Sequence, residues 1–218
     1  MVQKACTFEA QIIKTVRLNY LLFLPQGYGA DPEKKWPLIL FLHGMGERGD
    51  DLELIKIHGI PKIVEQGKDL KFIALSPQCP DSSFWTAETD ALDALLDEVV
   101  RQHAVDTARI YLTGLSMGGY GTWHLAVAYP DRFAAIAPIC GGGPVKKACR
   151  IKDIPVWAFH GAKDPVVSIE ESTKMVNALK ECGADVRFTV YPDAEHDAWT
   201  ETYDNPELYE WFLKHKKG

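Results

Sequence analysis

Residues 110–121 read IYLTGLSMGGYG and are the stretch of the sequence that most strongly indicates the fold. A run of β-branched, aromatic and other apolar residues, typical of a buried strand, leads into Gly-x-Ser-x-Gly centred on Ser116, and a helical pattern over residues 122–129 follows at once. Strand, sharp turn and helix form the context in which this motif is a nucleophile elbow. The stretch therefore predicts that Ser116 stands exposed on a tight turn between a strand and a helix.

The glycines of the motif have a steric task. A serine on so tight a turn has a strained backbone, so its close neighbours must lack side chains, and Gly114 and Gly118 meet that need. The turn also aims the N-terminus of the following helix, with its unpaired N–H groups, at the place where an oxyanion would form. We expect the N–H of Met117, the residue after the serine, to be one donor to that oxyanion.

Strand and helix patterns alternate along the rest of the chain, which predicts a mostly parallel, twisted sheet with helices on both faces. Residues 7–13 and 15–24 alternate or run apolar and predict an antiparallel hairpin that opens the fold. The loop at residues 140–153 is too short to hold a lid domain. No linker or repeat interrupts the chain, so residues 1–218 are expected to form a single domain. The other predicted strands are residues 37–43, 72–76, 109–113, 133–139, 154–160 and 186–191, and the predicted helices are residues 52–66, 89–104, 117–129, 168–181 and 206–215.

Three candidate residues follow the ends of predicted strands. Open α/β sheets bind ligands at the carboxyl ends of their strands, and Ser116, Asp164 and His196 each follow a different one. The order serine, acid, histidine is the one that hydrolases with this elbow use. Asp193 and Asp197 are alternatives for the acid because they lie beside His196, and either could instead hold its loop. A turn role for Asp164 is also open, but it would leave His196 without an orienting acid.

The chemistry requires all three groups. A serine hydroxyl is a weak nucleophile until a neighbouring imidazole takes its proton. That imidazole needs a carboxylate on its other nitrogen, which fixes the tautomer and stabilises the imidazolium. The oxyanion also needs N–H donors already in place, and removing one costs about 3–4 kcal/mol. The glycine-rich loop at residues 43–50 offers a second donor, for which we expect the N–H of Met45.

The remaining histidines are expected to have other tasks. His43 and His160 precede glycine at strand ends, where buried structural hydrogen bonding is the expected role. The others lie in or beside predicted helices and are expected to be structural or solvated; they are His58, His103, His124 and His215.

The composition is that of a soluble globular protein, with 46% hydrophobic and 25% charged residues in a chain of 218. A formal net charge of −6 argues against nucleic acid or an anionic membrane as a partner. No stretch approaches the ~18 apolar residues of a membrane helix, and the N-terminus lacks the pattern of a signal peptide. We expect a cytoplasmic protein without membrane insertion, or alternatively a secreted one if the sequence is part of a longer parent. The oligomeric state is not predicted.

The five cysteines show no metal-ligand spacing, so no metal is expected. Their odd number favours reduced thiols over a disulfide framework. Cys140 and Cys149 are the one pair close enough in sequence to suggest a bridge.

Four segments together resemble the lidless α/β-hydrolase esterases: residues 42–49, 114–121, 138–143 and 160–167. Within that group the chain is most similar to the phospholipase/carboxylesterase branch, which includes "predicted peptidase" and feruloyl-esterase-like members. The resemblance covers nearly the whole chain.

The resemblance implies a carboxylic-ester hydrolase that needs no metal or cofactor. It implies Ser116 as nucleophile, Asp164 as acid and His196 as base, with the N–H groups of Met45 and Met117 as the oxyanion hole. Dienelactone hydrolases share the fold but carry cysteine as the nucleophile, so Ser116 argues against that activity.

The substrate is less well defined than the chemistry. Trp85 and Trp199 are candidate walls of the substrate pocket, since each lies in or beside a loop at a strand's carboxyl end. Without a lid we expect an open cleft for small-molecule esters with short-chain or aromatic acyl groups. Amide or peptide hydrolysis by the same three residues is an alternative. A non-catalytic ligand-binding protein on this scaffold is another.

Overall fold

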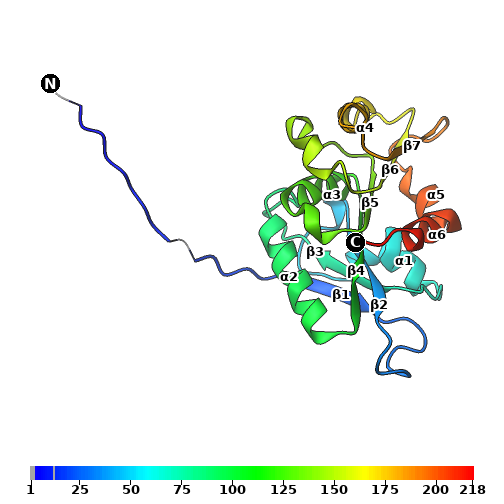
Figure 1. Ribbon diagram of the computed structural model, residues 1–218. Coiled ribbons are helices and arrows are strands. Elements are labelled where there is room, and N and C mark those ends of the chain that lie inside the picture. The colour runs from blue at the N-terminus through cyan, green and yellow to red at the C-terminus, as the bar shows by residue number, and fades with distance from the viewer. Residues whose placement is uncertain (1–2, 12) are drawn as a thin grey trace.

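The computed structural model describes residues 3–11 and 13–218 and builds them around one sheet. The seven strands lie in the order β1-β3-β2-β4-β5-β6-β7, and all neighbouring pairs are parallel except β1 with β3. This is the mostly parallel sheet that the alternation of strands and helices predicted, in the α/β-hydrolase arrangement that the resemblance implied (Figure 1). The strands are β1 (Asn19–Phe23), β2 (Trp36–Leu42), β3 (Ile73–Gln78), β4 (Val105–Leu115), β5 (Ala135–Ile139), β6 (Val156–Gly161) and β7 (Val186–Tyr191).

The sheet lies between two hydrophobic cores, and β2 shows why its sequence is apolar throughout. All seven of its residues are buried. Because successive side chains point to opposite faces, Leu38, Leu40 and Leu42 enter one core, and Ile39 and Phe41 enter the other.

Helices cover both faces, as the sequence predicted (Figure 1). Apolar residues of α2, α3 and α4 pack in the core that contains Leu38, and those of α1, α5 and α6 pack in the core that contains Ile39. The helix α5 has no counterpart among the predicted helices, because its six residues span less than two turns. The helices are α1 (Gly59–Glu65), α2 (Thr89–Gln102), α3 (Met117–Ala128), α4 (Glu170–Glu181), α5 (Trp199–Asp204) and α6 (Pro206–Lys214), and short 3₁₀ turns are η1 (Met45–Glu47), η2 (Leu54–Lys56), η3 (Pro130–Arg132) and η4 (Val145–Ile151).

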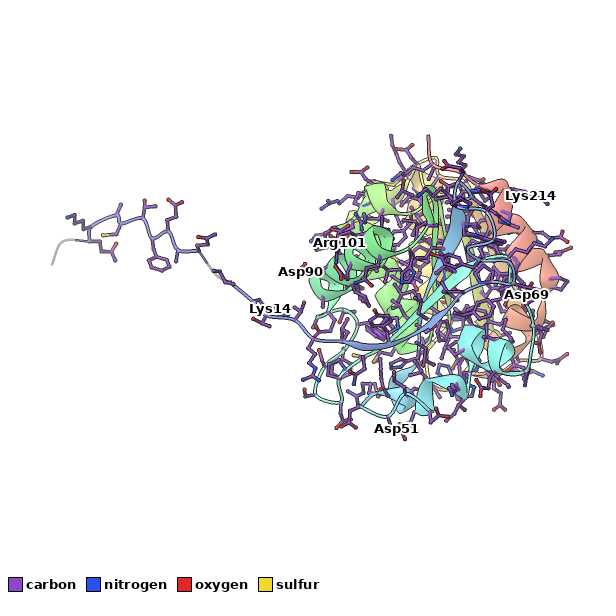
Figure 2. The ribbon with its side chains drawn as sticks, turned by 90° about the horizontal axis from the view of Figure 1, so that it is seen from below. Lys14, Asp51, Asp69, Asp90, Arg101 and Lys214 are labelled. Carbon is purple, nitrogen blue, oxygen red and sulfur yellow. A yellow bond between two sulfur atoms is a disulfide. The ribbon has the colours of Figure 1, made fainter. Side chains whose placement is uncertain are left out.

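The predicted N-terminal hairpin does not form. β1 pairs antiparallel with β3, and residues 3–11 and 13–18 form no strand; Ile12 lies outside the described residues. Residues 3–11 stand clear of the rest of the molecule (Figure 2), and the Phe8 and Ile13 side chains are exposed. A two-stranded hairpin is marginal in water, whereas pairing with β3 joins β1 to a buried sheet.

The prediction of reduced thiols is wrong for two of the cysteines, and the suggested pairing of Cys140 with Cys149 is wrong as well. Cys149, in η4, forms a disulfide with Cys182, which follows α4 and lies 33 positions later in the sequence. Cys140 is not bridged to Cys149 and remains a free thiol, as do Cys6 and Cys79. Disulfide formation depends on distance in space, and the two Cα atoms of the bridged pair lie 5.5 Å apart.

No helix in the described part of the chain is both long enough and apolar enough to span a membrane.

Candidate active site

Ser116 occupies the turn between β4 and α3, with φ 52° and ψ −115°. A positive φ is unfavourable for a residue other than glycine and persists only where the surrounding structure enforces it. Close packing enforces it here: a Cβ on Gly118 would lie 1.9 Å from the carbonyl oxygen of Leu42, and one on Gly114 would lie 2.4 Å from that of Gly118. The elbow therefore packs directly against β2, and only glycine fits at both flanking positions.

Ser116, His196 and Asp164 meet at the carboxyl ends of β4, β7 and β6. Ser116 Oγ lies 2.9 Å from His196 Nε2, and His196 Nδ1 lies 2.7 Å from Asp164 Oδ2. Gly161, the last residue of β6, lets the loop that carries His196 approach, because a Cβ there would lie 2.0 Å from the carbonyl oxygen of Glu195. The structure thus brings together the three side chains that the sequence singled out, as a chain of hydroxyl, imidazole and carboxylate.

The Asp164 side chain is fully buried, and both of its carboxylate oxygens accept hydrogen bonds. Its Oδ1 accepts hydrogen bonds of 2.9 Å from the N–H groups of Val166 and Val167. Burial acts to raise the pKa of this carboxyl, but hydrogen bonds from His196 and from the two backbone N–H groups outweigh burial and hold the pKa below its usual value. The group is therefore a carboxylate at neutral pH, which is the form that holds the imidazole proton on Nδ1.

The two alternative acids have other partners. Asp193 pairs with Lys163 Nζ at 2.7 Å on the surface. Asp197 accepts hydrogen bonds from the N–H and the hydroxyl of Thr200, both at 2.9 Å, at the start of α5. Asp197 therefore holds the loop beside His196, and neither carboxylate replaces Asp164 at Nδ1.

The two residues expected to supply the oxyanion donors, Met45 and Met117, line the same cavity as Ser116. Met45 is the first residue of η1 and Met117 is the first residue of α3. The first N–H groups of a helix have no partner within it, so both are free to meet a ligand oxygen.

Side chains brace the loop that carries Met45. His43 Nδ1 donates to the carbonyl oxygen of Gly44 at 2.6 Å, and Nε2 accepts from the N–H of Cys79 at 2.9 Å. Burial lowers the pKa of His43 to about 4, which keeps this imidazole neutral and preserves its acceptor nitrogen. Arg48 Nε adds a hydrogen bond of 3.2 Å to the carbonyl oxygen of Met45.

Trp85 is not a wall of the pocket, contrary to the sequence prediction. Its ring is fully buried, and its Nε1 donates to the carbonyl oxygen of His43 at 2.9 Å. It packs against Gly121, where a Cβ would lie 2.5 Å from the Trp85 Cβ. Its neighbours Phe84 and Thr86 line the cavity instead. The composition of this turn-rich loop does not reveal which of two adjacent aromatic rings turns inward.

The cavity beside Ser116 measures about 580 Å³, a size usual for small-molecule sites. Trp199 lines it, as predicted, and meets the His196 ring edge-to-face with the two centroids 5.0 Å apart. Sequence reasoning placed His58 on an outer helix, yet it also lines the cavity. Val166 and Val167 line it as well, and their positions two and three residues after Asp164 could have indicated this from the sequence.

One cluster in the described part of the chain has the residue types of a metal site. Ligand atoms of Cys140, Asp164 and His196 lie within 4.8 Å of one another. Asp164 and His196 already form a hydrogen bond with each other. Burial raises the pKa of the Cys140 thiol to about 12, which opposes the thiolate form that metals bind. The arrangement is suited to proton transfer at Ser116 rather than to holding an ion.

Comparison with known proteins gives three kinds of match. The model of the dienelactone hydrolase family matches residues 77–210. A bifunctional acetylxylan esterase/xylanase of Neocallimastix patriciarum is 27% identical over 83% of this chain and 28% of its own length. A probable feruloyl esterase C of Aspergillus terreus is 27% identical over 73% of this chain and 59% of its own. The crystal structure of a thermostable esterase superposes with a TM-score of 0.79 at 38% identity, covering 93% of this chain and 60% of that one. The chain thus spans less than two thirds of each of these relatives.

Proposed function

This chain belongs to the dienelactone hydrolase family, and from that premise we propose that it is a serine carboxylic-ester hydrolase that works through an acyl-enzyme. The observation that carries the proposal is the continuous hydrogen-bonded chain from Ser116 Oγ through His196 to Asp164. Residue 116 is a serine, so cleavage of dienelactones by a cysteine nucleophile is not proposed.

In the acylation step, His196 Nε2 takes the hydroxyl proton of Ser116 as Oγ attacks the ester carbonyl carbon. The carbonyl oxygen becomes an oxyanion and accepts hydrogen bonds from the N–H groups of Met45 and Met117. The Asp164 carboxylate stabilises the imidazolium. The Nε2 proton then passes to the leaving alkoxy oxygen, the carbon–oxygen bond breaks, and an alcohol departs from the acyl-enzyme.

Deacylation repeats these steps with water. His196 Nε2 removes a proton from water, whose oxygen attacks the acyl carbon, and the same two N–H groups bind the second oxyanion. The proton returns from Nε2 to Ser116 Oγ as the acyl–oxygen bond breaks. The carboxylic acid leaves and the enzyme is restored.

Short-chain or aromatic acyl esters are the proposed substrates. The cavity is lined largely by apolar groups, among them Met45, Phe84 and Trp199, and its volume suits an acetyl or a single-ring acyl group. The names of the two curated relatives, an acetylxylan esterase and a probable feruloyl esterase, point to the same range.

A fluorophosphonate probe tests the nucleophile. We expect stoichiometric labelling of the purified chain, abolished in Ser116→Ala and retained in the control Ser168→Ala, whose hydroxyl accepts from the Glu170 N–H outside the cavity. Hydrolysis rates on p-nitrophenyl esters of increasing chain length, with a feruloyl ester and a matched anilide, define the substrate class. Labelling that persists in Ser116→Ala, or faster cleavage of the anilide than of the ester, would contradict the proposal.

A further inference from the structure

His160 is a second imidazole that meets the same oxygen of Asp164 as His196 does. It lies in β6, and both its side chain and that of Asp164 are completely buried. His160 Nε2 lies 3.2 Å from Asp164 Oδ2 and 2.9 Å from the carbonyl oxygen of Val167. On the other side of the ring, Nδ1 lies 2.8 Å from Ser172 Oγ.

The position of the ring protons follows from the partners. Both atoms that face Nε2 are acceptors: the ionised carboxylate of Asp164 and the carbonyl oxygen of Val167. An unprotonated Nε2 would set its lone pair against two buried acceptors. A proton on Nε2 therefore forms the hydrogen bond to the carbonyl oxygen of Val167 and lies beside Asp164 Oδ2.

The Nδ1 side is compatible with that assignment. Ser172 Oγ can donate to Nδ1, which leaves the imidazole neutral with its proton on Nε2. The carbonyl oxygen of Gly141, which also lies 3.0 Å from Ser172 Oγ, still receives a hydrogen bond of 3.2 Å from Trp123 Nε1. If Ser172 donates to Gly141 instead, both ring nitrogens of His160 carry protons. In either arrangement Nε2 is protonated.

We propose that His160 is a positioning residue: its Nε2 proton, donated to the carbonyl oxygen of Val167, lies against Asp164 Oδ2 and holds the carboxylate in place for His196 by electrostatic attraction. The inference rests on the proposed function, in which Asp164 orients the base. Oδ1 is held by the N–H groups of Val166 and Val167, and His160 also holds Val167 through its carbonyl oxygen. Oδ2 thus accepts from His196 and faces the N–H of His160, and rotation of the carboxylate away from His196 would lose both interactions.

The protonation assignment is tested on the unmodified protein. Long-range ¹H–¹⁵N correlation spectra of histidine-labelled chain distinguish a protonated from an unprotonated ring nitrogen, and a His160→Gln spectrum assigns the signals. We expect Nε2 of His160 to carry a proton from pH 6 to 9. An unprotonated Nε2 in that range overturns the proposal, whether or not the protein hydrolyses esters.

Two matched variants test the positioning role. Glutamine at 160 places its amide N–H near the Nε2 position, whereas asparagine places it near Nδ1, out of reach of Asp164. We expect kcat on p-nitrophenyl acetate to fall about tenfold in His160→Asn, with KM changed less than twofold, and to stay within threefold of the parent in His160→Gln. The downfield proton resonance of the hydrogen bond between His196 and Asp164 should move in His160→Asn alone.

The control is Trp157→Phe. Trp157 lies in β6, as His160 does, and the substitution removes its part-buried hydrogen bond of 2.9 Å to Thr189 of β7 while leaving the three residues of the candidate site in place. We expect lower stability and an unchanged kcat in that variant. Equal kcat in His160→Asn and His160→Gln, with an unmoved downfield resonance, would make His160 an ordinary core histidine. Absence of ester hydrolysis by the parent chain would instead count against the proposed function.

Discussion

Replacing Asp164 with asparagine changes no volume but should stop the proposed reaction, and the structure explains why. The carboxylate accepts from Val166 and Val167 at Oδ1 and from His196 at Oδ2. An amide has only one acceptor oxygen, and we expect it to turn toward the two backbone N–H groups. Its NH₂ group then faces His196 Nδ1.

An NH₂ group at that position makes Nδ1 an acceptor and moves the imidazole proton to Nε2. The Nε2 proton would point at Ser116 Oγ, so His196 could no longer take the hydroxyl proton. Loss of the correct tautomer in a serine triad lowers kcat about 10⁴-fold, so we expect a fall on the order of 10³–10⁴ in Asp164→Asn.

The assay is kcat and KM on p-nitrophenyl acetate, with circular dichroism and thermal unfolding to establish that the variant is folded. Asp193→Asn and Asp197→Asn are the matched controls, and each should keep kcat within about threefold of the parent chain. Activity of a folded Asp164→Asn variant within tenfold of the parent would refute the assignment of the acid. A comparable loss in Asp193→Asn, whose carboxylate pairs with Lys163 on the surface, would do so as well.

Three further predictions concern the loop, the disulfide and pH. Trp85→Phe keeps an aromatic side chain but removes the hydrogen bond to the carbonyl oxygen of His43 and part of the buried ring volume, so urea unfolding should show at least about 1 kcal/mol lower stability and kcat should fall a few-fold. Replacing Cys149 and Cys182 together by serine should lower the free energy of unfolding by about 3–4 kcal/mol, because the disulfide closes a long loop, while kcat stays unchanged. His43 has a folded pKa of about 4, below its unfolded value, so protonation favours the unfolded chain as pH falls from about 6.5 toward 4. Urea unfolding at pH 5 should therefore give roughly 2 kcal/mol less stability than at pH 7.5 from this residue, and His43→Asn should lose that part of the pH dependence.

The parts of the site that the sequence predicted are those whose geometry follows from sheet topology. Parallel strands end at one edge, so residues that directly follow strands, such as Ser116, Asp164 and His196, converge without further information. The elbow glycines are likewise dictated by a local turn.

The predictions that failed depend on contacts between distant segments. The bridge between Cys149 and Cys182 requires η4 and the end of α4 to be neighbours, which no local pattern encodes. Trp85 and Phe84 are adjacent in sequence, and only the space beside Gly121 decides which ring is buried. The alternation of residues 7–13 resembled a strand, but β1 pairs with β3, and the described residues of that segment, 7–11 and 13, form no strand.

His160 shows a subtler limit. Its position before a glycine at a strand end predicted a buried structural histidine, and it is buried. That its Nε2 lies 3.2 Å from the oxygen already bonded to His196 depends on the path of the loop from Gly161 to Asp164. Strand and helix patterns do not describe such a path.

The most direct test of the central claim is mass spectrometry of the chain quenched during turnover of p-nitrophenyl acetate. The account predicts one added acetyl group, on the peptide that contains Ser116, and its loss in His196→Ala. Turnover without an acetylated intermediate, or an acetyl group on any other residue that tracks turnover, would contradict it.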